Sequence, residues 1–247
     1  DFNATKPAAS IHSNVADLSK WVQMLLNNGE FQGNQILPEN TLDPVFSAHT
    51  PLKVYDNQKL RGIHFRAYGL GWSMYDFNGR KVIEHNGGMP GYISKVTLVP
   101  EENFGFVVLN NGFDFFVHNA LKEDLLELFL NTDEDQDWIE IYADRKERYS
   151  KYQEQEKKKR IESRKEDTEP SLPLQAYAGL YKDKMYGNAR IEMKEGIPVL
   201  TLLPAKEVMT SEMKHWHYDT FRIDFKDPFL PFGLVTFDFN SDGEVIG

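Results

Sequence analysis

The chain has 247 residues, of which 40% are hydrophobic and 27% are charged, and its formal net charge is −10 at pH 7. This composition supports a packed core, and the acidic balance has the wrong sign for a general binder of the phosphate backbone, so we expect no nucleic-acid partner. No apolar run approaches the roughly 18–20 residues that cross a bilayer, so we expect no membrane span. The absence of cysteine excludes a disulfide framework, a thiolate metal site and a cysteine nucleophile.

The two ends of the sequence both resemble internal positions. The first residue is Asp1 rather than Met, and no basic segment followed by an apolar run comes after it. The last residues, ending at Gly247, are typical of a strand that follows a turn. We therefore expect the chain to be part of a longer protein.

An amphipathic helix is predicted over residues 15–28. Ser13 and Asn14 can accept hydrogen bonds from the free amides of its first turn, and apolar residues then recur at three- and four-residue spacing. Gly29 is a suitable C-terminal stop. The helix should therefore have one buried face.

Two β-hairpins are predicted within residues 68–110, after a short helix at residues 38–46 and a long surface loop at residues 48–66. Asn78-Gly79 tolerates the positive φ angles of a tight turn, and Pro100–Asn103 provides a second turn signal. The strands that flank these turns are expected at 68–76, 81–85, 92–99 and 104–110.

A further helix is predicted over residues 115–130. Together, the two hairpins and two helices predict an α+β fold in which helices cover an antiparallel sheet, and we assign residues 1–130 to this domain. The large apolar residues expected along one side of the helix are Leu121, Leu125, Leu128 and Phe129.

Residues 131–172 are predicted to form a charged linker helix. Thirteen acidic and ten basic residues are interleaved between Asp133 and Glu169. We interpret the segment as a solvated spacer, and the alternative is that one thin apolar stripe leans on a neighbouring element. That stripe would consist of Ile139, Ile141, Tyr142, Tyr149 and Tyr152.

Residues 173–247 are predicted to form a small all-β, barrel-like domain. Short apolar runs alternate there with turn signals such as Gly187-Asn188 and Asp242-Gly243. Strands are expected at 177–181, 189–193, 198–203, 216–223 and 234–239.

The residues most suited to chemistry lie between Glu84 and Tyr92, where a histidine ends a predicted strand and three glycines follow. Glycines allow close backbone approach, and free amides at a sheet edge could donate to a developing oxyanion. His85 could act as a general acid or as an electrostatic partner. The same pattern is also compatible with a glycine-rich turn beside an ordinary surface histidine.

An ordered set of segments resembles the serine β-lactamase-like hydrolases, which include class C β-lactamases, penicillin-binding DD-peptidases, D-aminopeptidases and related esterases. The resemblance covers residues 8–130, and its segments are Ala8–Trp21, Tyr68–Trp72, Glu84–Gly91, Leu98–Asn103 and Val107–Gly112. Further along, Tyr177–Tyr181 and His215–Arg222 resemble a β domain of unknown function that is often fused behind these hydrolases.

In this family, catalysis uses a Ser-x-x-Lys, a Tyr-x-Asn and a Lys/His-x-Gly motif in fixed chain order. Only the third is present at the matching place, as His85-Asn86-Gly87. The resemblance implies that His85 lies beside the nucleophile and helps to protonate or hold the substrate. It also implies that Gly88 offers its amide to the oxyanion hole, and that Asn86 and Gly87 contact the substrate.

Three other letter patterns match the missing motifs by chance. Ser211–Lys214 spells Ser-x-x-Lys, but it comes after the third motif and inside the β domain. Tyr55–Asn57 and Tyr186–Asn188 spell Tyr-x-Asn in a loop and in the β domain. We assign none of them a catalytic role.

Neither a metal nor an organic cofactor is expected. His215 and His217 are the best-placed pair of metal ligands, because both lie on one face of a strand. A third ligand is missing nearby, so we interpret both histidines as packing residues.

The sequence is therefore interpreted as the C-terminal part of a serine hydrolase that acts on an amide or ester through an acyl-serine, with the nucleophile upstream. Its partners would be a small-molecule or peptide substrate and the N-terminal part of its own hydrolase domain, and the chain alone would be inactive. The resemblance implies a bacterial parent in the periplasm or outside the cell. The alternative is a non-catalytic binding module for cell-wall or carbohydrate material.

Overall fold

The computed structural model describes residues 8, 10–59, 61–112, 114–130, 136–227 and 230–247. They form two compact units, the N-terminal unit (residues 2–150) and the C-terminal unit (residues 151–247). The division falls inside one long helix, α6 (Trp138–Glu162). Residues 131–135 of the predicted linker lie outside the described residues.

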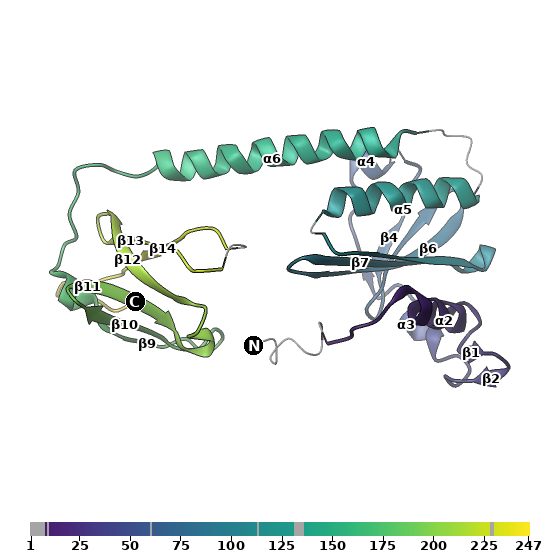
Figure 1. Ribbon diagram of the computed structural model, residues 1–247, viewed down its shortest axis with the longest axis horizontal. Helices are drawn as coiled ribbons and strands as arrows, with labels where there is room; N and C mark the ends of the chain where they lie inside the picture. The colour runs from purple at the N-terminus through teal and green to yellow at the C-terminus, as the bar shows by residue number, and fades with distance from the viewer. Residues whose placement is uncertain (1–7, 9, 60, 113, 131–135, 228–229) are drawn as a thin grey trace. The chain divides into compact units, whose positions relative to one another are not determined.

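The N-terminal unit is built on an antiparallel sheet whose strand order is β3-β4-β5-β6-β7-β8, so neighbours in the sheet are also neighbours in sequence (Figure 1). Asn78 and Gly79 adopt positive φ angles between β5 and β6, as the hairpin turn requires. Strands β7 and β8 pair in one sheet, which confirms the predicted hairpin around the 3-10 turn η2 (Pro100–Glu102). The strands are β3 (Thr50–Pro51), β4 (Arg66–Tyr68), β5 (Ser73–Phe77), β6 (Arg80–Met89), β7 (Tyr92–Val99) and β8 (Phe104–Asn110).

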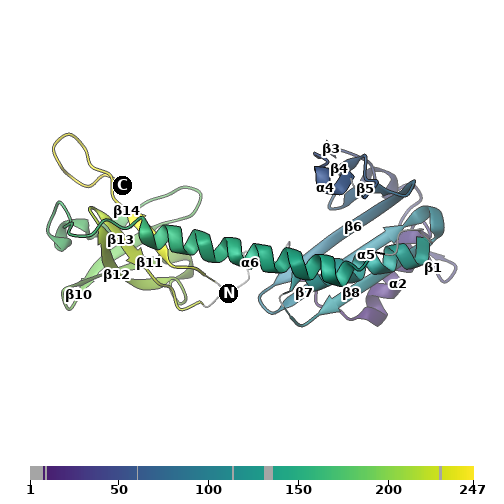
Figure 2. The ribbon, with the colours of Figure 1, turned by 90° about the horizontal axis from the view of Figure 1, so that it is seen from above.

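Helices α2 (Val15–Leu26) and α5 (Phe115–Leu130) lie on opposite faces of this sheet (Figures 1 and 2). One core lies between the sheet and α2 and includes Val22, Leu25, Met74, Ile83 and Leu98. A second core lies between the sheet and α5 and includes Tyr75, Phe77, Val82, Val99 and Leu126. This arrangement confirms the predicted α+β class.

The N-terminus of α2 has the cap that its sequence predicts. The Asn14 side chain accepts a hydrogen bond from the Asp17 amide at 3.0 Å, and such a cap typically stabilises a helix by about 1 kcal/mol. Short elements follow: β1 (Glu30–Phe31) and β2 (Asn34–Gln35), α3 (Leu42–Val45) within the helix expected at residues 38–46, and α4 (Asp56–Lys59) within the expected loop.

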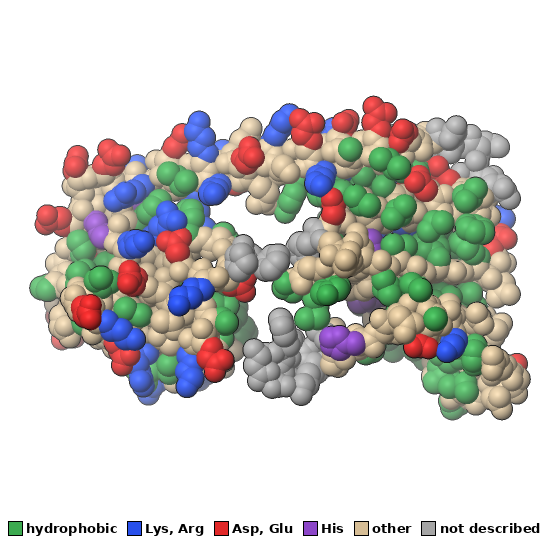
Figure 3. Space-filling view, viewed as in Figure 1, with side chains coloured by type: hydrophobic (Ala, Val, Ile, Leu, Met, Phe, Trp, Pro, Cys, Tyr) green, Lys and Arg blue, Asp and Glu red, His purple; other side chains and the backbone are tan. Residues whose placement is uncertain are grey.

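The side of α5 that carries Leu121, Leu128 and Phe129 is not the side that packs on the sheet. Leu121, Leu128 and Phe129 are exposed, and Figure 3 shows apolar side chains gathered over α5. The side of α5 that faces the sheet instead buries His118, Lys122 and Glu123. Lys122 and Glu123 can be buried there because Glu84, Tyr75 and Arg61 pair with them.

The first turns of α6 belong to the core of the N-terminal unit. Trp138 and Tyr142 are buried against Ala120 of α5, and the guanidinium of Arg61 lies over the Trp138 ring, 5.1 Å from its centre. The interpretation of the whole linker as a solvated spacer is therefore wrong at Trp138 and Tyr142, and Tyr142 belongs to the apolar stripe of the alternative.

The C-terminal unit contains a second six-stranded antiparallel sheet, in the order β14-β13-β12-β11-β10-β9. The single strand predicted at residues 216–223 is two strands, because the chain turns at Tyr218 and Asp219. The strands are β9 (Gly179–Tyr181), β10 (Ala189–Lys194), β11 (Ile197–Leu202), β12 (Thr210–His217), β13 (Thr220–Ile223) and β14 (Gly233–Thr236), with 3-10 turns η3 (Leu174–Tyr177) and η4 (Leu203–Ala205).

Tyr177 is fully buried at the centre of this unit's core, where its ring contacts Phe221 and Phe237. The end of α6 joins the same unit: Arg160 donates to the Phe232 carbonyl at 2.9 Å, and Arg164 donates to the Trp216 carbonyl at 2.8 Å. Among the described residues, no helix is both long and apolar enough to cross a membrane.

Candidate functional site

Strand β6 changes its surroundings at Glu84. Up to this residue β6 lies between β5 and β7, and Ser73–Glu84 is the last pair that it forms with β5. From His85 to Met89 it pairs, among the described residues, with β7 alone. The four predicted site residues therefore lie on the part of β6 that has one open edge.

The pairing register sets the direction of each backbone amide along this segment. The two-residue turn closes on the pair Met89–Tyr92, and antiparallel pairs alternate between bonded and non-bonded. His85, Gly87 and Met89 thus bond to β7, whereas Asn86 and Gly88 direct their N–H and C=O groups to the open edge. The Gly88 amide is placed where it can donate to a group outside the sheet.

The three glycines divide between the strand and the turn that follows it. Gly87 and Gly88 are strand residues, and the turn is made by Pro90 and Gly91, whose φ is +87°. A Cβ on Gly87 would overlap the Ser94 Oγ, and a Cβ on Gly88 would lie 3.3 Å from the Phe115 ring. At Gly87 an added side chain would meet the Ser94 hydroxyl, so close approach of β7 rather than turn geometry favours glycine there.

His85 and Asn86 are exposed and point to opposite faces of the sheet, because side chains alternate along a strand. His85 lies on the α2 side, where its ring meets the edge of Trp72 with 6.4 Å between ring centres. Trp72 is buried between Trp21 and Phe46. The structure thus brings all four predicted residues onto one edge and sets His85 against an aromatic support.

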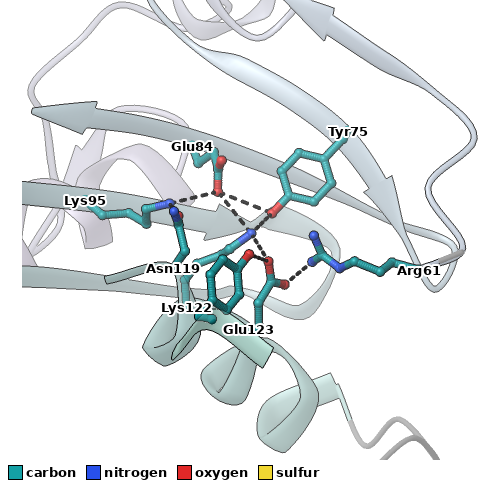
Figure 4. A network of polar contacts seen from close by, with 8 residues as sticks. Arg61, Tyr75, Glu84, Lys95, Asn119, Lys122 and Glu123 are labelled. Carbon is teal, nitrogen blue, oxygen red and sulfur yellow. Dashed lines mark hydrogen bonds and ion pairs between the residues drawn. The ribbon is translucent and has the colours of Figure 1, made fainter. Parts of the chain in front are cut away.

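A buried polar network, which no sequence motif indicates, lies beneath the same strand on the α5 side (Figure 4). Lys122 is at its centre, 2.8 Å from Glu123 Oε1, 3.0 Å from Tyr75 Oη and 3.8 Å from Glu84 Oε2. The members of this buried polar network are Arg61, Tyr75, Glu84, Lys95, Asn119, Lys122, Glu123 and Tyr142.

Mutual pairing keeps the network charged. Burial alone would raise the pKa of Glu84, but Lys122 and Lys95 outweigh it and hold that pKa below its ordinary value. Burial would lower the pKa of Lys122, but Tyr75, Glu84 and Glu123 together raise it. Burial does lower the pKa of Lys95, which Glu84 opposes only in part. The Tyr75 pKa is raised by burial and by Glu84, so its hydroxyl stays protonated.

The Ser-x-x-Lys letters in the C-terminal unit do not form a catalytic pair. Ser211 and Lys214 lie on strand β12, where residues three apart point to opposite faces; Ser211 is buried and Lys214 is exposed. The Ser211 hydroxyl donates to the Glu212 carbonyl at 2.8 Å and accepts from the Asp224 amide at 2.9 Å. Its hydroxyl therefore serves the local backbone.

His215 and His217 also have local partners. His215 Nε2 lies 2.9 Å from the Tyr218 carbonyl, and His217 Nδ1 accepts from the Lys165 amide at 3.2 Å. Within the part of the chain that the structure describes, no three His, Asp or Glu side chains gather as metal ligands.

Comparisons with known proteins assign both parts of the chain to families. A model described as Beta-lactamase matches residues 1–129, and a model described as a domain of unknown function, DUF3471, matches residues 163–247. Unguisins hydrolases of Aspergillus violaceofuscus and Aspergillus campestris are both 27% identical to this chain, over 195 and 143 residues. These matches cover 73% and 56% of this chain but only 34% and 25% of the relatives.

Two solved structures are similar at low identity. The octameric penicillin-binding protein homologue from Pyrococcus abyssi is 17% identical with a TM-score of 0.44, and the match covers 87% of this chain and 41% of that one. SurE is 14% identical with a TM-score of 0.36, covering 94% of this chain and 46% of its own. Since the Beta-lactamase model matches more than half of the residues, the chain belongs to the serine β-lactamase-like hydrolase family.

Proposed function

We propose that this chain forms one wall of the active site of an acyl-transfer hydrolase that acts on an amide or ester through an acyl-serine. The observation that carries the proposal is the open edge of β6, where the register turns the Gly88 amide away from β7. A fixed donor at the edge of a site stabilises the negative charge that develops on a carbonyl oxygen. One such donor typically contributes about 10²–10³-fold to kcat.

Each of the four residues has a distinct role in this proposal. Gly88 donates its amide to the oxyanion, and His85 holds or protonates the substrate from the α2 side of the strand. Asn86 extends toward the substrate from the other side of the strand. Gly87 keeps the strand flat against Ser94 so that the substrate can approach the backbone.

The nucleophile is proposed to lie upstream of residue 1, in a Ser-x-x-Lys motif followed by a Tyr-x-Asn motif. The curated relatives support the hydrolase class by their names alone, and this chain spans about a third of the length of the first. They are fungal, so they lend no support to the bacterial and periplasmic origin, which stays a prediction.

The test is turnover by the intact protein that contains this chain, with His85→Ala compared against His64→Ala. His64 is exposed and pairs with Asp76 at 3.2 Å on another strand, so it serves as the control. Loss of a positioned acid or base costs about 10²–10⁴-fold in rate, and the control should stay within about twofold. Unchanged turnover in His85→Ala would refute the assigned role. An intact sequence without the two upstream motifs would favour the binding module instead.

A further inference from the structure

Glu84 is the residue of β6 at which pairing with β5 ends. It forms the last pair between β6 and β5, and the next residue, His85, begins the segment that only β7 supports. Its side chain lies on the α5 face and is 15% exposed. A strand that loses one neighbour loses half of its backbone hydrogen bonds, so its position depends more on what holds its side chains.

The buried polar network contacts β6 through the Glu84 side chain. Glu84 Oε2 accepts from the Tyr75 hydroxyl at 3.2 Å and lies 3.8 Å from Lys122 Nζ and 3.9 Å from Lys95 Nζ. Tyr75 is on β5, Lys95 is on β7 and Lys122 is on α5, so Glu84 is tied to three elements at once (Figure 4). Lys95 is also the residue paired with Asn86 across the strands.

The same contacts continue from α5 to the first turns of α6. One carboxylate oxygen of Glu123 pairs with Lys122 at 2.8 Å and accepts a hydrogen bond from the Tyr142 hydroxyl at 3.1 Å. The other oxygen pairs with Arg61. The Glu123 side chain is fully buried. The network therefore contains three cations, two carboxylates and two hydroxyls that donate to those carboxylates. They belong to Arg61, Lys95 and Lys122, to Glu84 and Glu123, and to Tyr75 and Tyr142.

We infer that Glu84 is a positioning residue for the His85–Gly88 edge, and that Lys122, Glu123 and Tyr142 act on that edge through it. The inference rests on the proposed function of the edge. Truncating one side of such a buried ion pair leaves a charge unpaired. At Glu84, the resulting shift would fall on the one segment of β6 that has no second strand to restrain it.

The first experiment measures kinetics of the intact protein with Glu84→Gln, which keeps the shape and removes the charge. A shift of about 1 Å at an oxyanion donor costs on the order of 10²-fold, so we expect kcat to fall about 10- to 100-fold with little change in KM. Tyr75→Phe, which removes one hydroxyl from Glu84, should act in the same direction by a smaller factor.

The control is Glu102→Gln. Glu102 also pairs with β6, through Arg80 at the far end of the strand, and both side chains are partly exposed. Its kcat should stay within about twofold. If Glu84→Gln and Glu102→Gln both keep a kcat close to that of the natural enzyme, the inference is overturned. If both variants lose kcat by the same factor, the effect is not specific to Glu84 and the inference is also overturned.

The second experiment needs no activity and uses the chain as it stands. In Glu84→Gln, hydrogen exchange should accelerate at least about tenfold at the Gly87 and Met89 amides, which bond to β7, while bonded β7–β8 pairs such as Thr97–Phe106 keep their protection. Exchange that rises equally across the sheet would reduce Glu84 to a general stability role and contradict the inference.

The two experiments separate this inference from the proposed function. If His85→Ala leaves turnover intact, the proposed function fails, and the exchange result still decides whether Glu84 positions the edge. If His85→Ala abolishes turnover but Glu84→Gln changes neither kcat nor local exchange, only the inference fails.

Discussion

Gly87 and Ser94 face each other across β6 and β7, and a Cβ on Gly87 would overlap the Ser94 Oγ in its present rotamer. Replacing a strand glycine by alanine usually favours folding by about 0.4–1 kcal/mol through the unfolded state. Here overpacking, which costs about 1–3 kcal/mol, should win. We expect Gly87→Ala to lower the free energy of unfolding of the chain in urea titrations.

Removing the Ser94 hydroxyl provides the matched control. The Ser94 Cβ would lie 3.6 Å from a Cβ on Gly87, an ordinary contact. The double variant Gly87→Ala/Ser94→Ala should therefore recover most of the loss, and Ser94→Ala alone should change little. Strict additivity of the two single changes would contradict the steric explanation.

His118 predicts a pH dependence of stability. It is buried on α5, and within the described residues neither ring nitrogen has a hydrogen-bond partner. Burial and the nearby Lys95 hold the pKa of His118 below its ordinary value of about 6.5. Between the folded and unfolded pKa values the unfolded chain binds the extra proton, so stability is full above about pH 6.5 and falls as the pH drops below it.

The measurement is the urea midpoint at pH 7.5 and pH 5.0 for the natural chain and for His118→Leu. The natural chain should lose more stability on acidification than the variant, because leucine binds no proton. Identical pH slopes for the two proteins would show that His118 does not titrate on unfolding.

Tyr177 anchors the entry into the C-terminal unit. Its hydroxyl donates to Asp219 Oδ1 at 2.5 Å and accepts from the Leu172 amide at 3.2 Å. Hydrogen bonds to charged groups contribute about 1.5–3 kcal/mol, so Tyr177→Phe should lower the stability of this unit by that amount. Hydrogen exchange of residues 172–239 measures it, with Tyr186→Phe at an exposed tyrosine as the control.

The same bond predicts an alkaline effect. Burial and Asp219 raise the pKa of Tyr177 to about 12, so the unfolded chain loses the phenolic proton first as the pH rises above about 10. The stability difference between the natural chain and Tyr177→Phe should therefore shrink between about pH 10 and pH 12. A difference that stays constant across this range would contradict the assignment.

The histidine of the motif predicts a preference among substrates. A lysine at this position would present an ammonium group to a substrate carboxylate, whereas an imidazole can also hydrogen-bond a neutral group. We expect the intact enzyme to accept neutral esters or amides and to gain little from a substrate carboxylate. Turnover of matched carboxylate and amide substrates at pH 5.5 and 8.5 measures this. A large carboxylate preference that is equal at both values would count against it.

The elements of the N-terminal unit could be predicted where local rules decide them. Asn14 caps α2, and Asn78-Gly79 turns the hairpin, because both act within a few residues of themselves. The continuation of β6 through Gly87 and Gly88 could not be predicted from the sequence, because a glycine-rich segment normally indicates a turn. The close approach of Ser94 to Gly87 depends on the pairing of β6 with β7.

The buried polar network was missed for a related reason. Lys122 and Glu123 lie between leucines on a helix, and composition places charged residues on the surface. Their burial depends on Glu84, Tyr75 and Arg61, which come from other elements. The one available signal was Tyr142, which belonged to the thin apolar stripe considered for the linker.

The central claim is that this chain supplies an oxyanion edge but no nucleophile. A labelled fluorophosphonate or β-lactam, applied to the purified chain and to the intact protein and followed by intact-mass analysis, tests it most directly. Removing the nucleophile from such a site typically costs on the order of 10⁶-fold in rate, so the chain should acquire no adduct and the intact protein should acquire one, on a serine upstream of Asp1. A stoichiometric adduct on any serine of this chain, Ser211 above all, would contradict the claim.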